Sequence, residues 1–128
     1  MEAIIVDAGP LVAYLERADR DHAWSRAQFK LLHDPLITCD AVLSEAFFLL
    51  RQSSGGGEKL LQLLERKIVL PAFDLAAELA RVSSLMRCYE TVPMSLADAC
   101  LVRMAELHEP GRVFTLDSDF KIYRKNRR

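Results

Sequence analysis

Short apolar runs alternate with longer amphipathic segments along the whole chain. The apolar runs have strand length and predict four strands, at Ala3–Asp7, Leu36–Cys39, Lys67–Leu70 and Arg112–Thr115. Between them, apolar residues recur at helical spacing after capping residues or a proline. The predicted helices are Pro10–Ala18, Asp21–His33, Asp40–Gln52, Glu58–Glu65, Asp74–Cys88 and Leu96–His108.

Strands that alternate with helices favour a mostly parallel sheet covered by helices on its faces. We therefore expect an α/β fold. The length of 128 residues fits one domain, residues 1–128. The Gly-rich segment Ser53–Gly57 is expected to be a surface loop. A helical turn at Ser118–Lys121 and a strand from Ile122 are expected to complete the domain.

The sequence also bears on the cellular location of the protein. The chain starts with an apolar strand rather than a basic leader, and it has no apolar run near the roughly 18 residues that cross a bilayer. A cytoplasmic protein without a membrane segment is expected. The three cysteines are odd in number and widely spaced, which argues against a disulfide framework and favours reduced core thiols.

Charge is nearly balanced overall but uneven along the chain. The formal net charge is −1, yet five of the 17 Lys and Arg lie in Lys121–Arg128, where there is no acid. This basic end would attract a polyanion such as RNA. A solvated terminus that only aids solubility is the alternative.

Acidic residues lie at the positions where a parallel sheet binds ligands. Asp7 ends the first predicted strand, and Asp117 follows the last one. If these two strands are neighbours at the point where the strand order reverses, their carboxylates face one crevice. Asp98, in the first turn of its helix, and Glu45, after the second strand, would join them.

Each acid also has a purely structural interpretation. Asp98 lies three residues after Ser95 and could cap its helix, while Asp7 and Asp117 could cap turns. Glu45 precedes an apolar run, Ala46–Leu50, which is unusual for an exposed acid. Clustered carboxylates favour a hard divalent cation, Mg²⁺ or Mn²⁺ over zinc, and such a site suits phosphodiester hydrolysis.

At these residues the sequence resembles the PIN-domain family, in particular its VapC-like toxins. The matching segments are IIVDAGPLVAYL (Ile4–Leu15), DAVLSEAFFLL (Asp40–Leu50), PMSLADACLVRMAE (Pro93–Glu106) and VFTLDSDF (Val113–Phe120). The resemblance implies a three-layer α/β/α sandwich. It also implies that Asp7, Glu45, Asp98 and Asp117 are the metal-binding and catalytic residues, with Thr115 and Asp119 in support.

The resemblance further implies a Mg²⁺- or Mn²⁺-dependent endoribonuclease with an RNA substrate, a cognate antitoxin and a homodimer. One departure concerns the first motif. Many relatives have Ser or Thr directly after the first aspartate, where this chain has Ala8 and Gly9. The missing hydroxyl would then come from Ser44 or Ser118. The basic end could hold RNA, an antitoxin or a second copy.

Two other classes of function stay open at this point. A signalling receiver domain has a similar length and acids at strand ends, but it needs an aspartate after its third strand, where this chain has Pro71 and Ala72. A non-catalytic PIN module would bind protein or RNA without cutting it. Metal-dependent cleavage distinguishes the nuclease from both.

Overall fold

Four strands and six helices alternate in the computed structural model, which describes residues 3–88, 94–108 and 111–116. The elements are β1 (Ala3–Val6), α1 (Ala8–Leu15), α2 (His22–Lys30), β2 (Leu36–Thr38), α3 (Asp40–Leu49), α4 (Gly56–Glu65), β3 (Val69–Pro71), α5 (Leu75–Cys88), α6 (Leu96–Leu107) and β4 (Gly111–Phe114). None of these described helices is long and apolar enough to cross a membrane. The elements predicted at Ser118–Lys121 and from Ile122 lie outside the described residues.

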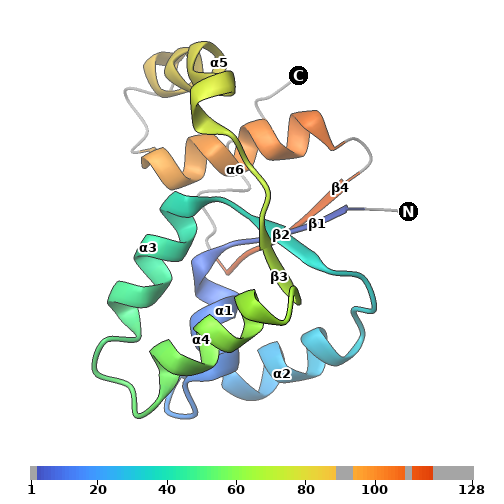
Figure 1. The fold of residues 1–128 in the computed structure, drawn as a ribbon, viewed down its shortest axis with the longest axis vertical. Coiled ribbons are helices and arrows are strands. Elements are labelled where there is room, and N and C mark those ends of the chain that lie inside the picture. The colour runs from blue at the N-terminus through green and yellow to red at the C-terminus, as the bar shows by residue number, and fades with distance from the viewer. Residues whose placement is uncertain (1–2, 89–93, 109–110, 117–128) are drawn as a thin grey trace.

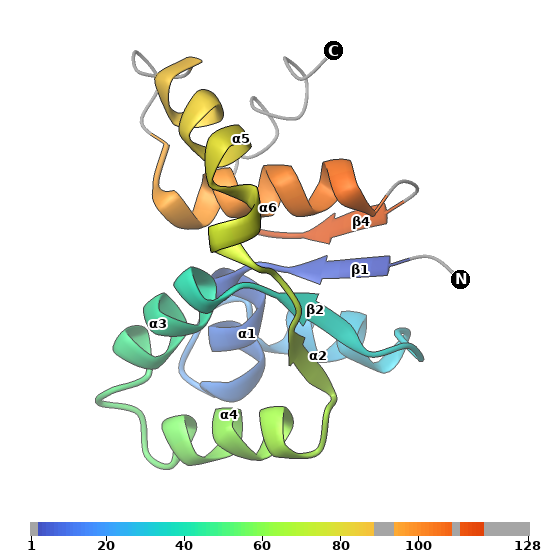
Figure 2. The ribbon, with the colours of Figure 1, turned by 45° about the horizontal axis from the view of Figure 1, so that its top comes forward.

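The sheet is parallel, with the strand order β3-β2-β1-β4 (Figure 2). The central strand β1 pairs with both neighbours, so that Ile5 lies beside Ile37 on one side and Val113 on the other. The chain builds outward from β1 to β3 and then crosses back to β4. The strand order therefore reverses between β1 and β4, where open α/β sheets bind their ligands.

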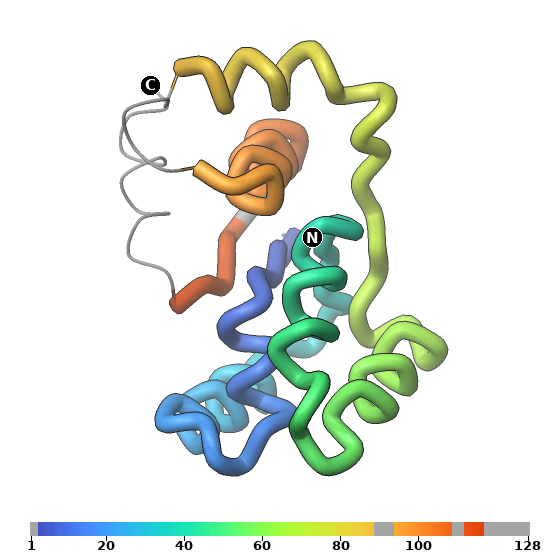
Figure 3. The backbone as a smooth tube through the Cα atoms, turned by 90° about the vertical axis from the view of Figure 1, so that its left-hand side faces the viewer, coloured from blue at the N-terminus to red at the C-terminus, as the bar shows by residue number. Residues whose placement is uncertain are grey.

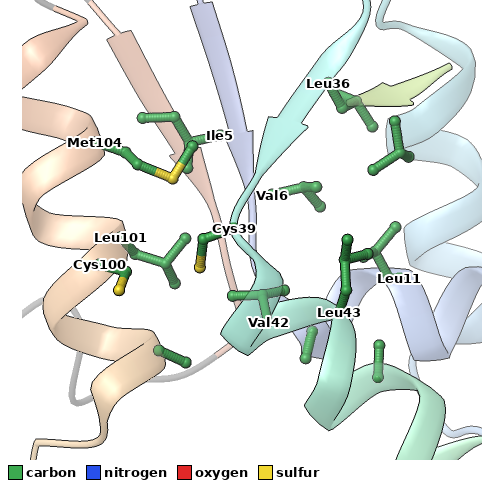
Figure 4. Close-up of a cluster of buried hydrophobic side chains, with 14 of the residues drawn as sticks. Ile5, Val6, Leu11, Leu36, Cys39, Val42, Leu43, Cys100, Leu101 and Met104 are labelled. Carbon is green, nitrogen blue, oxygen red and sulfur yellow. The ribbon is translucent and has the colours of Figure 1, made fainter. Parts of the chain in front are cut away.

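Helices cover both faces of the sheet, which confirms the predicted three-layer α/β fold. In Figure 1, α5 and α6 lie above the strands, α1, α2 and α4 lie below them, and α3 lies to the left; Figure 3 shows α5 and α6 on the opposite side of the strands from α2 and α4. Side chains of β1 alternate between the layers: Ile5 points toward Met104 of α6 and Val6 toward Leu11 of α1 (Figure 4). All four side chains are fully buried. Burial on both faces explains why β1 is a continuous apolar run.

Helix α5 is joined to α6 by a network of ion pairs. Arg81 contacts Glu106 at 2.6 Å, while Arg103 contacts Glu78 at 2.6 Å and Glu106 at 3.2 Å. The Arg81 guanidinium lowers the pKa of Glu106. Because α6 carries Asp98, this network helps to fix the helix on which one candidate site residue lies.

Helix α1 begins and ends earlier in the chain than predicted. It begins two residues earlier than expected because Asp7, rather than a later residue, is its N-cap. It ends at Leu15, because Glu16 adopts an extended backbone and its side chain accepts a hydrogen bond from the Ala18 amide. The acid at the end of β1 and the start of α1 are thus one structural unit.

The predicted Gly-rich loop is partly helical. Helix α3 ends at Leu49 rather than Gln52, and α4 begins at Gly56 rather than Glu58. Gly55 has a φ of 76°, which glycine adopts without strain. A Cβ at Gly56 would lie 2.9 Å from Cδ2 of Leu50, so close packing also requires glycine there.

Two of the three cysteines are core thiols, as predicted. Cys39 and Cys100 are buried, whereas Cys88 is exposed at the end of α5, so the core interpretation is wrong for Cys88. All three thiols are free.

Candidate active site

Asp7 lies at the end of β1, beside the end of β4. Its backbone N–H donates to the Phe114 carbonyl at 3.0 Å. Its carboxylate accepts two hydrogen bonds, from the Ala8 amide to Oδ1 at 2.7 Å and from the Thr115 hydroxyl to Oδ2 at 2.9 Å. The residue is 7% exposed. Asp7 is therefore held in a fixed orientation where the strand order reverses, as the sequence analysis required.

Thr115 was predicted to be a supporting polar residue, and its hydroxyl contacts the Asp7 carboxylate. This bond joins residues 108 positions apart, so it brings the end of β4 to the first predicted ligand. Asp117 and Asp119 lie outside the described residues, and their place in the site stays a prediction.

If Asp7 is a metal ligand of a ribonuclease, as the sequence predicts, Thr115→Val should lower RNA cleavage by roughly 10-fold, because lost outer contacts of metal ligands cost about 10- to 100-fold. Valine keeps the shape of threonine but cannot donate to Asp7. Single-turnover cleavage rates of the folded variants measure the effect. Thr38→Val is the control, since the Thr38 hydroxyl is buried and donates to the Val6 carbonyl at 2.8 Å rather than to a carboxylate. Equal rates for the two variants would contradict an orienting role for Thr115.

Asp98 caps the helix on which it lies. Its Oδ2 accepts from the Ser95 amide at 3.1 Å, and its own amide donates to the Ser95 hydroxyl at 3.0 Å, a reciprocal capping box. The capping interpretation is thus confirmed. The cap also fixes the carboxylate at the first turn of α6, so a structural role and a chemical role are compatible at this residue.

The first turn of α6 lies at the same edge of the sheet as Asp7. Cys39, directly after β2, is hydrogen-bonded to Cys100 of α6, and both thiols are buried (Figure 4). This bond lowers the pKa of Cys39 and, together with burial, raises that of Cys100. The negative charge of Asp7 opposes this lowering of the Cys39 pKa. The thiol pair therefore connects the ends of β1 and β2 with the helix that carries Asp98.

Three helices, α1, α3 and α6, begin at this edge of the sheet. The first two follow the carboxyl ends of β1 and β2 directly, and α6 runs antiparallel to the strands into β4. The N-terminus of a helix carries a partial positive charge and unpaired amide donors. This edge is consequently favourable both for ionised carboxylates and for a bound phosphate.

Glu45 lies in the middle of α3 and is exposed. Its neighbour Ser44, another predicted supporting residue, lines a cavity of about 310 Å³ between α3, α6 and the start of α5. Asp40 lines the same cavity. The sequence analysis gave Asp40 only a capping role, but Cys39 is the N-cap and Asp40 is the first helical residue.

The structure thus brings Asp7, Thr115 and the first turn of α6 to one edge of the sheet. Within the described residues, no three or more His, Cys, Asp or Glu side chains are grouped closely enough to hold a metal ion. Asp7, Glu45 and Asp98 are all described and do not form such a group, while Asp117 lies outside the described residues. The donors available at this edge are carboxylate oxygens, which fit Mg²⁺ or Mn²⁺ better than a softer metal.

Comparison with known proteins gives consistent results. The sequence model of the PIN domain family matches residues 4–126. The chain is 27% identical over 118 residues to Ribonuclease VapC26 of Mycobacterium tuberculosis, covering 89% of this chain and 86% of that protein. The crystal structure of VapC20 from the same species, described as a sarcin-ricin-loop-cleaving toxin, matches with a TM-score of 0.80 at 18% identity over 94% of both chains. At that identity the structural match shows the fold alone.

Proposed function

Because the chain belongs to the PIN-domain family, we propose that it is a Mg²⁺- or Mn²⁺-dependent endoribonuclease and the toxin of a VapBC-type toxin–antitoxin pair. The observation that carries the proposal is the position of Asp7. Its buried carboxylate is held by Ala8 and Thr115 where the strand order reverses. The match to a relative that is named a ribonuclease covers 86% of that relative's length and supports the same activity.

Four acids would hold the metal: Asp7, Asp98 and Asp117, with Glu45 completing the set or orienting the attacking water. When bound, the metal ion would activate a water molecule and offset negative charge that develops on the scissile phosphate. Carboxylate oxygens are the appropriate donors for this ion. Zinc is a poorer fit, because protein zinc sites usually contain His or Cys ligands and this set contains neither.

The remaining groups at the edge would position the substrate and the acids. Thr115 orients Asp7, and Ser95 orients Asp98 through the capping box. The N-termini of α1, α3 and α6 favour the negative charge of an RNA phosphate. Ser44 on the neighbouring cavity would supply the hydroxyl that many relatives carry after the first aspartate.

The proposed partners follow from the same assignment. RNA is the substrate, a cognate antitoxin would inhibit the enzyme, and two copies would form a homodimer. With such a substrate and inhibitor, the protein would act in the cytoplasm.

Removal of divalent metal is expected to abolish cleavage, because water activation at this site requires the ion. The test incubates a pool of structured and unstructured RNA with purified protein in Mg²⁺, in Mn²⁺, in EDTA, and in EDTA followed by excess Mg²⁺. Cleavage that stops with EDTA and returns with Mg²⁺ is the expected result. Undiminished cleavage in EDTA would contradict metal dependence. Metal-independent RNA binding without cleavage in any condition would favour the non-catalytic module.

A further inference from the structure

A second concave surface lies away from the candidate active site, where α1 ends. It is a cavity of about 240 Å³ formed by residues of α2 and α4 and by the segment that follows α1. Five basic side chains from around α1, α2 and α4 line it: Arg17, His22, Arg26, Lys59 and Arg66. We call this surface the basic cavity. Such a concentration is unexpected in a chain whose net charge is −1.

The cations of the basic cavity are not neutralised by partners in the fold. Among the described residues, Arg17, Arg26, Lys59 and Arg66 form no salt bridge, whereas Arg103 of α6 contacts two carboxylates. Like charges held around one concavity repel one another unless an anion binds there.

Two local interactions do not change this balance. The Arg26 guanidinium lies over the Tyr14 ring, 5.9 Å from the ring centroid, and this contact does not neutralise its positive charge. Glu16 interacts with Lys59 and His22, but its pKa is lowered mainly by a hydrogen bond with Ser53. Glu16 is not among the residues that line the cavity, and the four fixed cations that do line it give it an excess of positive charge.

We propose that the basic cavity binds backbone phosphates of the RNA on one side of the cleavage point. This inference rests on the proposed ribonuclease function. Helix α1 connects the two surfaces, since Asp7 is its N-cap and Arg17 follows its C-cap. Its eight residues span about 12 Å at 1.5 Å per residue. A stacked strand, with about 3.4 Å per phosphate, covers that distance in about four nucleotides.

The chemistry of the cavity favours phosphates over an acidic peptide. Three of its four fixed cations are arginines, whose planar group binds phosphate with two parallel hydrogen bonds. The cations come from several elements around the cavity, which suits a ligand that carries a charge at every repeat. An RNA strand already placed at Asp7 presents such charges without any further partner.

The test measures RNA binding in EDTA, so that cleavage cannot intervene. A fluorescein-labelled single-stranded RNA of 20 nucleotides with mixed sequence is titrated with the wild-type chain and with Arg17→Gln/Lys59→Gln, at several NaCl concentrations. Each lost phosphate contact should reduce the slope of log K against log salt by about 0.7, so the double variant should lose about 1.4.

Matched controls separate a local contact from the general loss of charge. Arg87→Gln removes one exposed cation on α5, outside the basic cavity, and is compared with Arg17→Gln alone. A 20-residue polyglutamate peptide is titrated in parallel. Unchanged RNA affinity and salt slope in the double variant would overturn the proposal, and so would an equal loss in Arg87→Gln. A loss confined to polyglutamate binding would assign the cavity to a protein partner instead.

Failure of this inference differs from failure of the proposed function. If the wild-type chain cuts RNA with Mg²⁺ while the double variant binds normally, only the basic cavity is wrongly assigned. If no RNA is cut under any metal condition but the double variant loses affinity, the cavity binds RNA and the proposed catalytic activity is wrong.

Discussion

Asp98→Asn is expected to reduce metal-dependent RNA cleavage by at least about 10²-fold, more than the loss of an outer contact to a metal ligand normally costs. The substitution removes a negative charge from the first turn of α6 but keeps the size of the side chain. The amide oxygen of asparagine can still accept from the Ser95 amide, as Oδ2 of Asp98 does at 3.1 Å. The fold should therefore persist, and single-turnover cleavage with saturating Mg²⁺ measures the chemical effect.

Two controls separate chemistry from helix capping at this residue. Ser95→Ala removes the hydroxyl half of the capping box and should cost about 1 kcal/mol of stability while leaving most of the cleavage. Asp74→Asn makes the same charge change at an exposed helix start, since Asp74 Oδ1 accepts from the Ala77 amide at 3.2 Å. Full cleavage by Asp98→Asn would contradict its catalytic role. An equal loss in folded Ser95→Ala would show that the cap, not the carboxylate, accounts for the effect.

Local signals explain why the elements could be predicted. The apolar run of β1 indicates a strand buried on both faces, and Ser95 followed by Asp98 indicates a helix start that the structure confirms. The observed starts of α1 and α4, at residues 8 and 56, differ from the predicted starts because they depend on contacts with other parts of the chain. Gly56, the first residue of α4, packs closely against Leu50, a contact that no local propensity reveals.

The strand order could not be predicted from the sequence, and it decides the site. The contact between Thr115 and Asp7 depends on β4 returning to pair with β1 rather than with β3. Sequence spacing placed acids after strands but did not show which strands are neighbours. The observed order also excludes the receiver-domain alternative, in which the third strand pairs with the first.

Glu45 is exposed, as are two of its apolar neighbours. Its apolar neighbours suggested an unusual environment for an acid, but Phe48 and Leu49 are themselves 59% and 49% exposed. The apolar run therefore does not bury Glu45, and its functional assignment now depends on the family resemblance. The same exposure does not contradict that assignment, since a ligand to a substrate or metal must be accessible.

Leu101→Ala is expected to destabilise the protein by about 2–5 kcal/mol, the usual cost of removing a large buried aliphatic side chain. Leu101 is fully buried on α6, in the core cluster that also contains Ile5 of β1 (Figure 4). Truncation loses apolar burial and leaves a cavity that tightly packed neighbours cannot fill. Urea unfolding monitored by circular dichroism should show a lower midpoint with an unchanged slope.

Leu107→Ala is the matched control on the same helix, because Leu107 is 46% exposed. It should change stability by no more than about 0.5 kcal/mol, as surface substitutions usually do. Since total stability is typically about 5–15 kcal/mol, Leu101→Ala removes a large part of it. Cleavage by Leu101→Ala should then fall as temperature rises but approach the wild-type rate in the cold, whereas Asp98→Asn should be inactive at every temperature. Equal midpoints for Leu101→Ala and Leu107→Ala would contradict the packing of α6 on β1, and with it the placement of Asp98 at the same edge of the sheet as Asp7.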